Sequence, residues 1–167
     1  MNRYKIPMKM IKTLMENDAK AGAVSWVGIR PGKKKPLQSC SVVQVNPEHG
    51  LVGDHYSANS KKRQVTLIQA EHIAALNSFL DRDITPEQLR RNIVVEGFNL
   101  LSLAKKHFEI DGVILQMTGL CHPCSRMEEV LGCGGYNAMR GHGGITATVI
   151  TAGEIKRGAK IVSLADS

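Results

Sequence analysis

Hydrophobic residues along this chain gather in short runs, and glycine, proline or asparagine separates one run from the next. Most of the runs are rich in Val, Ile and Thr, the residues that favour strands. They are residues 24–29, 41–45, 64–69, 93–95, 113–117, 146–151 and 160–164. Few helical segments lie between them, which argues against a parallel α/β sheet. The pattern predicts a β-rich fold, mainly β or α+β, with a barrel or sandwich at its centre and peripheral helices.

Three segments have the spacing of amphipathic helices: residues 9–20, 70–80 and 85–91. In the third segment, Thr85 is a suitable N-cap residue and Gln88 completes a capping box. We therefore expect three helices outside the β-rich core.

The length of 167 residues suits one domain, and no repeat or long linker divides the chain. We expect residues 1–22 to form an N-terminal helical extension and residues 23–165 to form the domain. No apolar run is long enough to cross a bilayer, and the lysines scattered through the first twenty residues are not typical of a secretory signal. A cytoplasmic protein without a membrane partner is the expectation.

The net charge of +7 points to an acidic partner. Nucleic acid is not favoured, because the basic residues are spread along the chain and only 4% of residues are aromatic. A phosphorylated or acidic small molecule also fits the charge.

The strongest chemical signal is a pair of cysteines two residues apart, Cys121 and Cys124. They follow an apolar run and precede residues 125–131, which have the pattern of a short helix. A helix start favours the thiolate, the form of cysteine that attacks or binds a metal. The residues leave four interpretations open: a redox pair, a zinc site completed by Cys133 and His142, one activated thiolate at Cys124 that binds a soft metal or carries sulfur, and simple packing.

A predicted turn at residues 50–55 leaves polar side chains on an exposed edge. Gly53 suits the turn, Asp54 can orient an amine or an arginine, and His55 can bind phosphate or relay protons. A turn with a capping aspartate explains the same residues without any ligand.

Two further clusters have anion-binding chemistry. Arg91 and Asn92 stand between a helix and a strand, where they can supply a guanidinium fork and an amide, although a solvated helix end is the simpler interpretation. Residues 140–144 read Arg-Gly-His-Gly-Gly, and such glycines permit close backbone approach and exposed N–H groups. A glycine-rich loop by itself is weak support for a site.

Taken in this order, the clusters resemble the MOSC domain, the C-terminal domain family of molybdenum cofactor sulfurases. The similarity covers residues 24–164. It runs through residues 50–55, 63–68 with Glu71, 91–97, 118–124, 143–144 and 153–158.

The resemblance implies a β-barrel domain that holds a molybdopterin-type cofactor or carries the sulfur destined for it. Cys124 matches the functional cysteine of the family and would be a ligand to molybdenum, while Arg91 and Asn92 would help to hold the pterin and its phosphate. Pyridoxal phosphate is not expected, because it belongs to a separate domain of larger sulfurases. The cofactor-binding set expected on this basis is Gly53, Asp54, His55, Arg63, Arg91, Asn92, Gly141, His142, Gly143 and Gly144.

Two functions share these residues. As an enzyme, the protein would be a molybdenum-dependent oxidoreductase acting on N-hydroxylated compounds, and it would need an external electron donor because the sequence has no flavin, haem or Fe–S motif. As a carrier, it would bind cofactor or persulfide sulfur and pass it to an acceptor. A structural zinc or nucleic-acid-binding module is the third alternative.

Larger family members have an additional N-terminal β-barrel domain, so a small free-standing module is the expectation.

Overall fold

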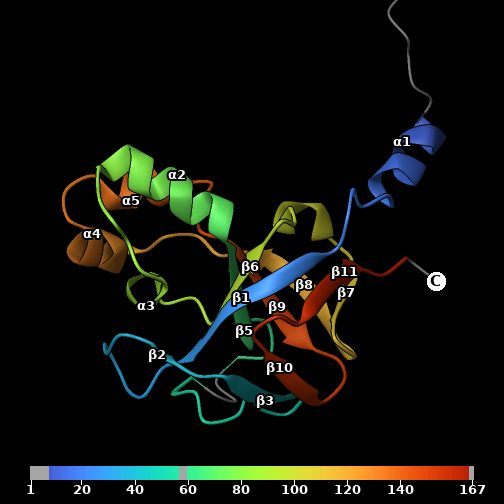
Figure 1. Cartoon of the computed structure of the whole chain (residues 1–167), viewed down its shortest axis with the longest axis horizontal. Helices are drawn as coiled ribbons and strands as arrows, with labels where there is room; N and C mark the ends of the chain where they lie inside the picture. The colour runs from blue at the N-terminus through green and yellow to red at the C-terminus, as the bar shows by residue number, and fades with distance from the viewer. Residues whose placement is uncertain (1–7, 57–59, 166–167) are drawn as a thin grey trace, which may run out of the picture.

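The computed structural model describes residues 8–56 and 60–165. Within these residues, seven strands close into a barrel in the order β11-β7-β8-β9-β5-β6-β1, and β1 pairs again with β11 (Figure 1). The β-rich fold with peripheral helices that the sequence predicts is therefore confirmed. The barrel strands are β1 (Gly22–Ile29), β5 (Val65–Gln69), β6 (Ile93–Glu96), β7 (His107–Ile110), β8 (Val113–Leu120), β9 (Ile145–Val149) and β11 (Lys160–Ser163).

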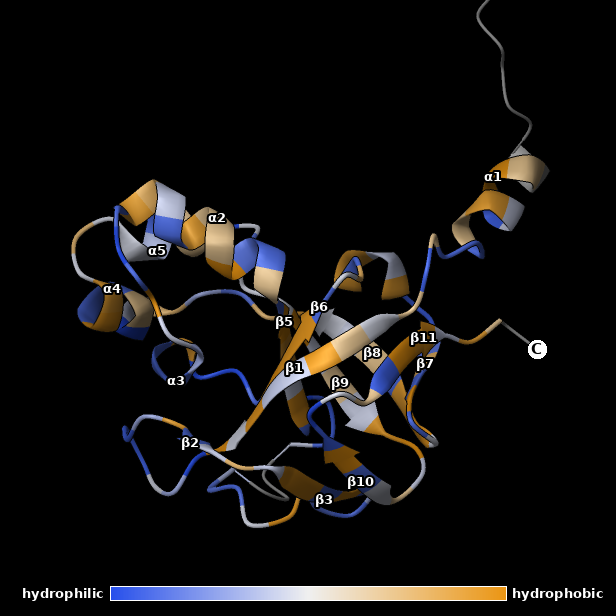
Figure 2. Ribbon diagram, in the orientation of Figure 1, coloured by the Kyte–Doolittle hydropathy of each residue, from blue (hydrophilic) through white to orange (hydrophobic). Residues whose placement is uncertain are grey.

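A smaller sheet covers one end of the barrel. It consists of β3 (Val42–Asn46), β4 (Gly50–Leu51) and β10 (Gly153–Lys156), while the short β2 (Gln38–Ser39) pairs with the end of β1. Val43, Val45 and Ile155 from this sheet are buried in the same hydrophobic cluster as the barrel interior. Figure 2 shows hydrophobic residues along the barrel strands and on β3 and β10. The main core is thus the barrel interior closed at one end by the smaller sheet.

Four of the helices form a second core on the outside of the barrel (Figure 1). Ile68, Val94 and Trp26 from the barrel strands pack there against buried residues of α2, α3, α4 and α5. The helices are α1 (Met8–Met15), α2 (Ala70–Leu80), α3 (Pro86–Leu89), α4 (Ser125–Leu131), α5 (Gly135–Met139) and the 3-10 helix η1 (Leu100–Leu103).

Two helices are shorter than the sequence predicts. The first ends at Met15 instead of residue 20, and Asp18 accepts hydrogen bonds from the backbone N–H and the hydroxyl of Ser163, so the chain turns there toward β11. The third ends at Leu89 because Arg90 adopts a left-handed conformation with φ of 59°. The capping box of Thr85 with Gln88 is present as predicted.

Strand register brings five residues into one row across the barrel. β5 and β6 are parallel, whereas the other neighbouring barrel strands are antiparallel. The row consists of the paired residues Val27, Ile93, Leu67, Ile145 and Leu120.

Three residues of the candidate functional site flank this row. Arg91 and Asn92 precede Ile93 of the row, and Cys121 follows Leu120. Because register fixes the heights of paired strands relative to one another, the barrel brings the start of β6 and the end of β8 to the same level.

The described residues include no helix that is both long and apolar enough to cross a membrane.

Barrel closure depends on the seam between β1 and β11, where Gly22 pairs with the fully buried Ile161. We expect Ile161→Ala to lower the free energy of unfolding by about 2–5 kcal/mol, because it removes core packing and leaves a cavity. Lys160→Ala, whose side chain is exposed, changes it by no more than about 0.5 kcal/mol. Urea denaturation followed by circular dichroism measures both, and equal effects would contradict the importance of the seam.

Candidate functional site

A cleft of about 310 Å³ lies beside Cys124, and we call it the arginine cleft. Among the described residues that line it, five are arginines and none is a carboxylate, so it favours an anionic ligand. A larger, mainly apolar cavity lies next to it, but the exposed Cys124 lines the arginine cleft and not that cavity. The lining residues are Arg30, Tyr56, Ser60, Arg63, Thr66, Arg90, Arg91, His122, Cys124, Arg126 and Met127.

The two cysteines of the pair lie in different environments. Cys124 is exposed and is the N-cap residue of α4, with its carbonyl oxygen accepting a hydrogen bond from the Met127 N–H at 2.9 Å. Cys121 is buried, and its Sγ accepts a hydrogen bond from the Arg63 guanidinium at 3.4 Å. Both are free thiols. Only Cys124 lines the arginine cleft.

Asp54 and Asn92 lie beneath the cleft and hold Arg30 in place. The Asp54 carboxylate accepts hydrogen bonds from the Arg30 side chain at 3.0 Å, the Arg30 backbone N–H at 2.8 Å and the Asn92 amide at 3.1 Å. Asn92 also accepts a hydrogen bond from the Thr66 hydroxyl at 2.8 Å and donates one to the Gly28 carbonyl at 3.2 Å. A buried polar network of this kind fixes side-chain geometry when all members are paired. Asp54 and Asn92 therefore act on the cleft through Arg30.

Asp54 also orients Tyr56, the aromatic side chain in the cleft lining. Its Oδ2 accepts a hydrogen bond from the Tyr56 backbone N–H at 3.0 Å, and the Arg30 guanidinium lies 5.2 Å from the centre of the Tyr56 ring. That separation is within the range of a cation–π contact. One carboxylate thus bonds to both the Arg30 guanidinium and the Tyr56 backbone.

Arg91 joins three segments of the chain. Its guanidinium donates to the carbonyl oxygens of Gly143 at 2.7 Å, Leu89 at 3.0 Å and Cys121 at 3.3 Å. The residue is 5% exposed. Burial lowers the pKa of Arg91, and the nearby cations of Arg63 and Arg30 act in the same direction. Arg91 therefore fixes two loops relative to the start of β6. These are the cysteine loop, residues 121–124, and the glycine loop, residues 140–144.

The glycine loop packs directly on the cysteine loop. A Cβ atom on Gly143 would lie 2.0 Å from the Cys121 carbonyl oxygen, and one on Gly144 would lie 1.9 Å from that of Leu67. The Gly144 carbonyl in turn accepts a hydrogen bond from the Cys121 N–H at 2.8 Å. Glycine is required at both positions by close backbone approach.

A family model of the MOSC domain matches residues 54–162, which is well over half of the chain. The protein belongs to the MOSC domain family.

Several solved structures have the same fold. The YuaD protein from Bacillus subtilis is 20% identical with a TM-score of 0.75, covering 85% of this chain and 94% of its own. YiiM from Geobacillus stearothermophilus is 14% identical with a TM-score of 0.70, covering 86% and 75%. YiiM from Escherichia coli is 15% identical with a TM-score of 0.66, covering 87% and 71%. At these identities the similarity is one of fold. No curated protein sequence matches the chain.

The MOSC barrel distributes the other expected cofactor-binding residues over several places. Gly141, Gly143 and Gly144 line the neighbouring apolar pocket. Gly53 lies in an exposed turn, and the His55 ring lies edge-on to Tyr56 with centroids 4.9 Å apart. Neither Gly53 nor His55 is among the residues that line the arginine cleft.

His142 belongs to a small cluster of rings on the outside of α2. Its ring centroid lies 4.9 Å from that of His72 and 5.3 Å from that of Phe79. Burial lowers the pKa of His72, and the neighbouring His142 contributes to this. In residues 8–56 and 60–165, no three His, Cys, Asp or Glu side chains are arranged to hold a metal ion. The zinc interpretation with Cys133 and His142 is therefore not supported.

Several lining residues of the cleft were not identified from the sequence. His122 and Arg126 flank Cys124, so their proximity to the motif was an available signal. The sequence has no comparable signal for Arg30 and Tyr56. Each is an isolated residue that reaches the cleft only through barrel register and the contact with Asp54.

Asn92→Ala tests the network beneath the cleft. Asn92 is fully buried, and its loss removes buried hydrogen bonds to the Gly28 carbonyl, the Asp54 carboxylate and the Thr66 hydroxyl. We expect the free energy of unfolding to fall by about 2–4 kcal/mol. Asn137→Ala, at an exposed position, is the control and changes it by about 0.5 kcal/mol or less. A loss at Asn92 as small as that at Asn137 would show that the network does not support the fold.

Proposed function

We propose that the arginine cleft binds the molybdenum cofactor and that the Cys124 thiolate is the protein ligand to molybdenum. The observation that carries this proposal is the combination of an exposed thiol and five arginines in one cleft without a carboxylate lining it. A thiolate is a soft ligand suited to a transition metal. Guanidinium groups bind phosphate through paired hydrogen bonds, as the phosphate of a pterin cofactor requires. The donor set therefore fits the cofactor that is associated with the MOSC family.

The residues of the cleft have separate tasks in this proposal. Arg63, Arg90 and Arg126 bind the phosphate and keep it oriented. Arg30, whose two terminal nitrogens donate to protein groups and which is ion-paired with Asp54, forms part of the cleft wall. Arg91 donates its hydrogen bonds to backbone carbonyls and keeps the cysteine loop in position. His122, exposed beside Cys124, can hold or deliver a proton to a ligand in the cleft.

We further propose that the loaded protein reduces N-hydroxylated compounds. Such a reduction breaks the N–O bond, consumes two electrons and two protons, and releases an amine and water. The bound cofactor would supply the two-electron redox chemistry, and an external electron-donor protein would supply the electrons. The polar, cationic wall of the cleft would orient the N–O group.

Molybdenum content of three cysteine variants tests the ligand assignment. We expect Cys124→Ser to lose nearly all bound molybdenum, because a neutral hydroxyl is a much poorer ligand than a thiolate. Cys133→Ser, at an exposed site outside the cleft, retains it, and Cys121→Ser retains most of it. Elemental analysis of protein purified from a molybdenum-replete host gives the values. Equal losses in Cys121→Ser and Cys124→Ser would contradict a single thiolate ligand.

Turnover distinguishes an enzyme from a carrier. Molybdenum-loaded protein supplied with a reduced electron donor should convert an N-hydroxylated compound to the amine, and Cys124→Ser should not. Loaded protein that transfers cofactor or sulfur to an acceptor without reducing such a compound would be a carrier.

The anion-binding role of the arginines can be measured without the cofactor. We expect Arg126→Ala to weaken binding of inorganic pyrophosphate by about tenfold, because it removes one charge-assisted contact worth about 1.4 kcal/mol. Arg157→Ala is the matched control, since Arg157 is exposed, lies outside the cleft and bonds to Ser39. Isothermal titration calorimetry at two salt concentrations gives the affinities. Equal weakening in both variants would indicate a general charge effect and no specific cleft.

A further inference from the structure

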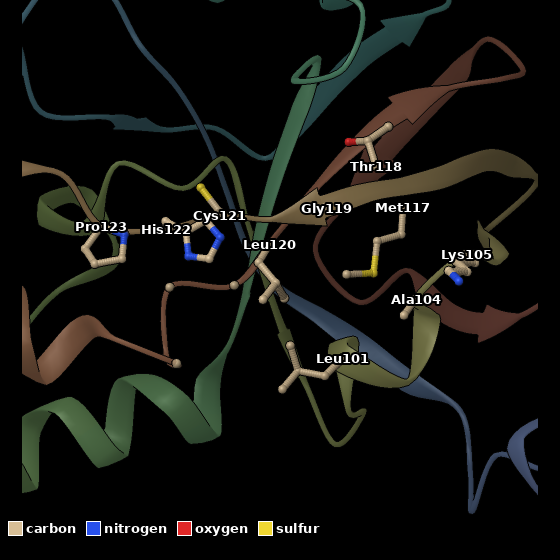
Figure 3. Close-up of a pocket in the computed structure, with 13 residues that line it drawn as sticks. Leu101, Ala104, Lys105, Met117, Thr118, Gly119, Leu120, Cys121, His122 and Pro123 are labelled. Atoms are coloured by element: carbon tan, nitrogen blue, oxygen red, sulfur yellow. The ribbon is translucent and has the colours of Figure 1, made fainter.

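The buried sulfur of Cys121 has no task in the function proposed above, which uses the thiol of Cys124. Cys121 is 1% exposed and is not among the residues that line the arginine cleft. The residue borders the neighbouring cavity, but Figure 3 shows its sulfur pointing away from Leu101 and Leu120. The sulfur is therefore directed to a different contact.

That contact is with Arg63, one of the arginines of the cleft. The Arg63 guanidinium donates a hydrogen bond to Cys121 Sγ at 3.4 Å. Sulfur is a weak acceptor, but a guanidinium has five N–H donors, so one bond to sulfur leaves others that can face an anion. Because Arg63 lines the cleft and Cys121 does not, the sulfur contacts the guanidinium from the protein side.

The position of Arg63 is costly without a support. Arg63 lies close enough to Arg91 for the two cations to repel each other, and this repulsion contributes to the lowered pKa of Arg91. No carboxylate among the described lining residues of the cleft offsets the repulsion. A long side chain at an exposed position also loses conformational freedom when it is held in one place. A fixed acceptor beside the guanidinium offsets part of these costs.

The backbone of Cys121 makes its sulfur such a fixed acceptor. The Cys121 N–H donates to the Gly144 carbonyl at 2.8 Å, and the Cys121 carbonyl accepts a hydrogen bond from Arg91 at 3.3 Å. Gly143 packs so closely on the same carbonyl oxygen that a Cβ atom there would lie 2.0 Å from it. With both backbone polar groups bonded and a loop packed against it, the residue holds its sulfur in one place.

We propose that Cys121 is a positioning residue whose sulfur orients the Arg63 guanidinium toward an anion in the arginine cleft. The two cysteines of the pair then have different tasks. Cys124 faces the ligand directly, and Cys121 acts on the ligand through Arg63. The anion-binding role of Arg63 rests on the proposed function, whereas the hydrogen bond between Cys121 and Arg63 does not.

Binding of inorganic pyrophosphate to the cofactor-free full-length protein, measured by isothermal titration calorimetry, tests this role. Arg63→Ala should weaken binding by about tenfold, because it removes a charge-assisted contact. Cys121→Ala should weaken it by about three- to fivefold, because one hydrogen bond that holds Arg63 is lost. Cys40→Ala is the matched control, since Cys40 is a half-buried free thiol outside the cleft, and it should bind like the parent protein.

Two further variants separate hydrogen bonding from packing. Cys121→Ser keeps an acceptor and should bind within about twofold of the parent protein. Cys121→Val fills the space of the sulfur without accepting a hydrogen bond, so it should bind as weakly as Cys121→Ala. Circular dichroism establishes that each variant is folded, and the comparison of Ser with Val decides the matter if Cys121→Ala does not fold.

A double variant shows whether the sulfur acts through the guanidinium. Arg63→Ala combined with Cys121→Ala should bind no more weakly than Arg63→Ala alone. Additive losses, or equal weakening in Cys121→Ser and Cys121→Val, would overturn the positioning role. A loss in Arg63→Ala without one in Cys121→Ala would also overturn it and leave the proposed function in place. Equal affinity in the parent protein, Arg63→Ala and Arg126→Ala would refute the anion-binding part of the proposed function and the positioning role with it.

Discussion

The guanidinium of Arg91 contacts the carbonyl oxygens of three segments that lie far apart in the sequence, namely those of Leu89, Cys121 and Gly143. Burying a cation is costly unless its hydrogen-bonding capacity is used. Here the partners are carbonyl dipoles, and no carboxylate bonds to this guanidinium among the described residues. Neighbouring Arg63 adds repulsion, which contributes to the lowered pKa of Arg91. An anion bound in the cleft would relieve that repulsion, so ligand binding and stability are coupled.

The sequence predicts the elements that carry a run of apolar residues or an amphipathic helical pattern and omits the elements that carry neither. β5, β6 and α2 were found because runs of Val and Ile, or one apolar helical face, identify them. β7 reads His-Phe-Glu-Ile and β10 reads Gly-Glu-Ile-Lys, so neither contains a run of apolar residues, and α5 starts at a glycine. Their positions depend on pairing with β8, β11 and β3, which no local signal carries.

Some residues of the candidate site could likewise be predicted from the sequence, and others could not. Cys124 could be singled out because a turn, a second cysteine and a helix start coincide there. The roles of Asp54 and Asn92 as supports for Arg30 could not, since they require β1 and β6 to lie in register with the turn that holds Asp54. Likewise, the glycines at 143 and 144 suggested a ligand loop, whereas the carbonyl oxygens of Cys121 and Leu67 explain why larger residues are excluded.

The pairing of Gly22 with Ile161 has a consequence for how the protein folds. Almost the whole chain separates these two residues, and contacts between such distant residues form slowly because a long loop must first be closed. During synthesis, β5, β6 and the cysteine loop emerge from the ribosome well before β11 is available to join β1. The barrel around the site therefore cannot close until β11 has been synthesised. The cleft therefore acquires its final shape only after β11 has joined β1.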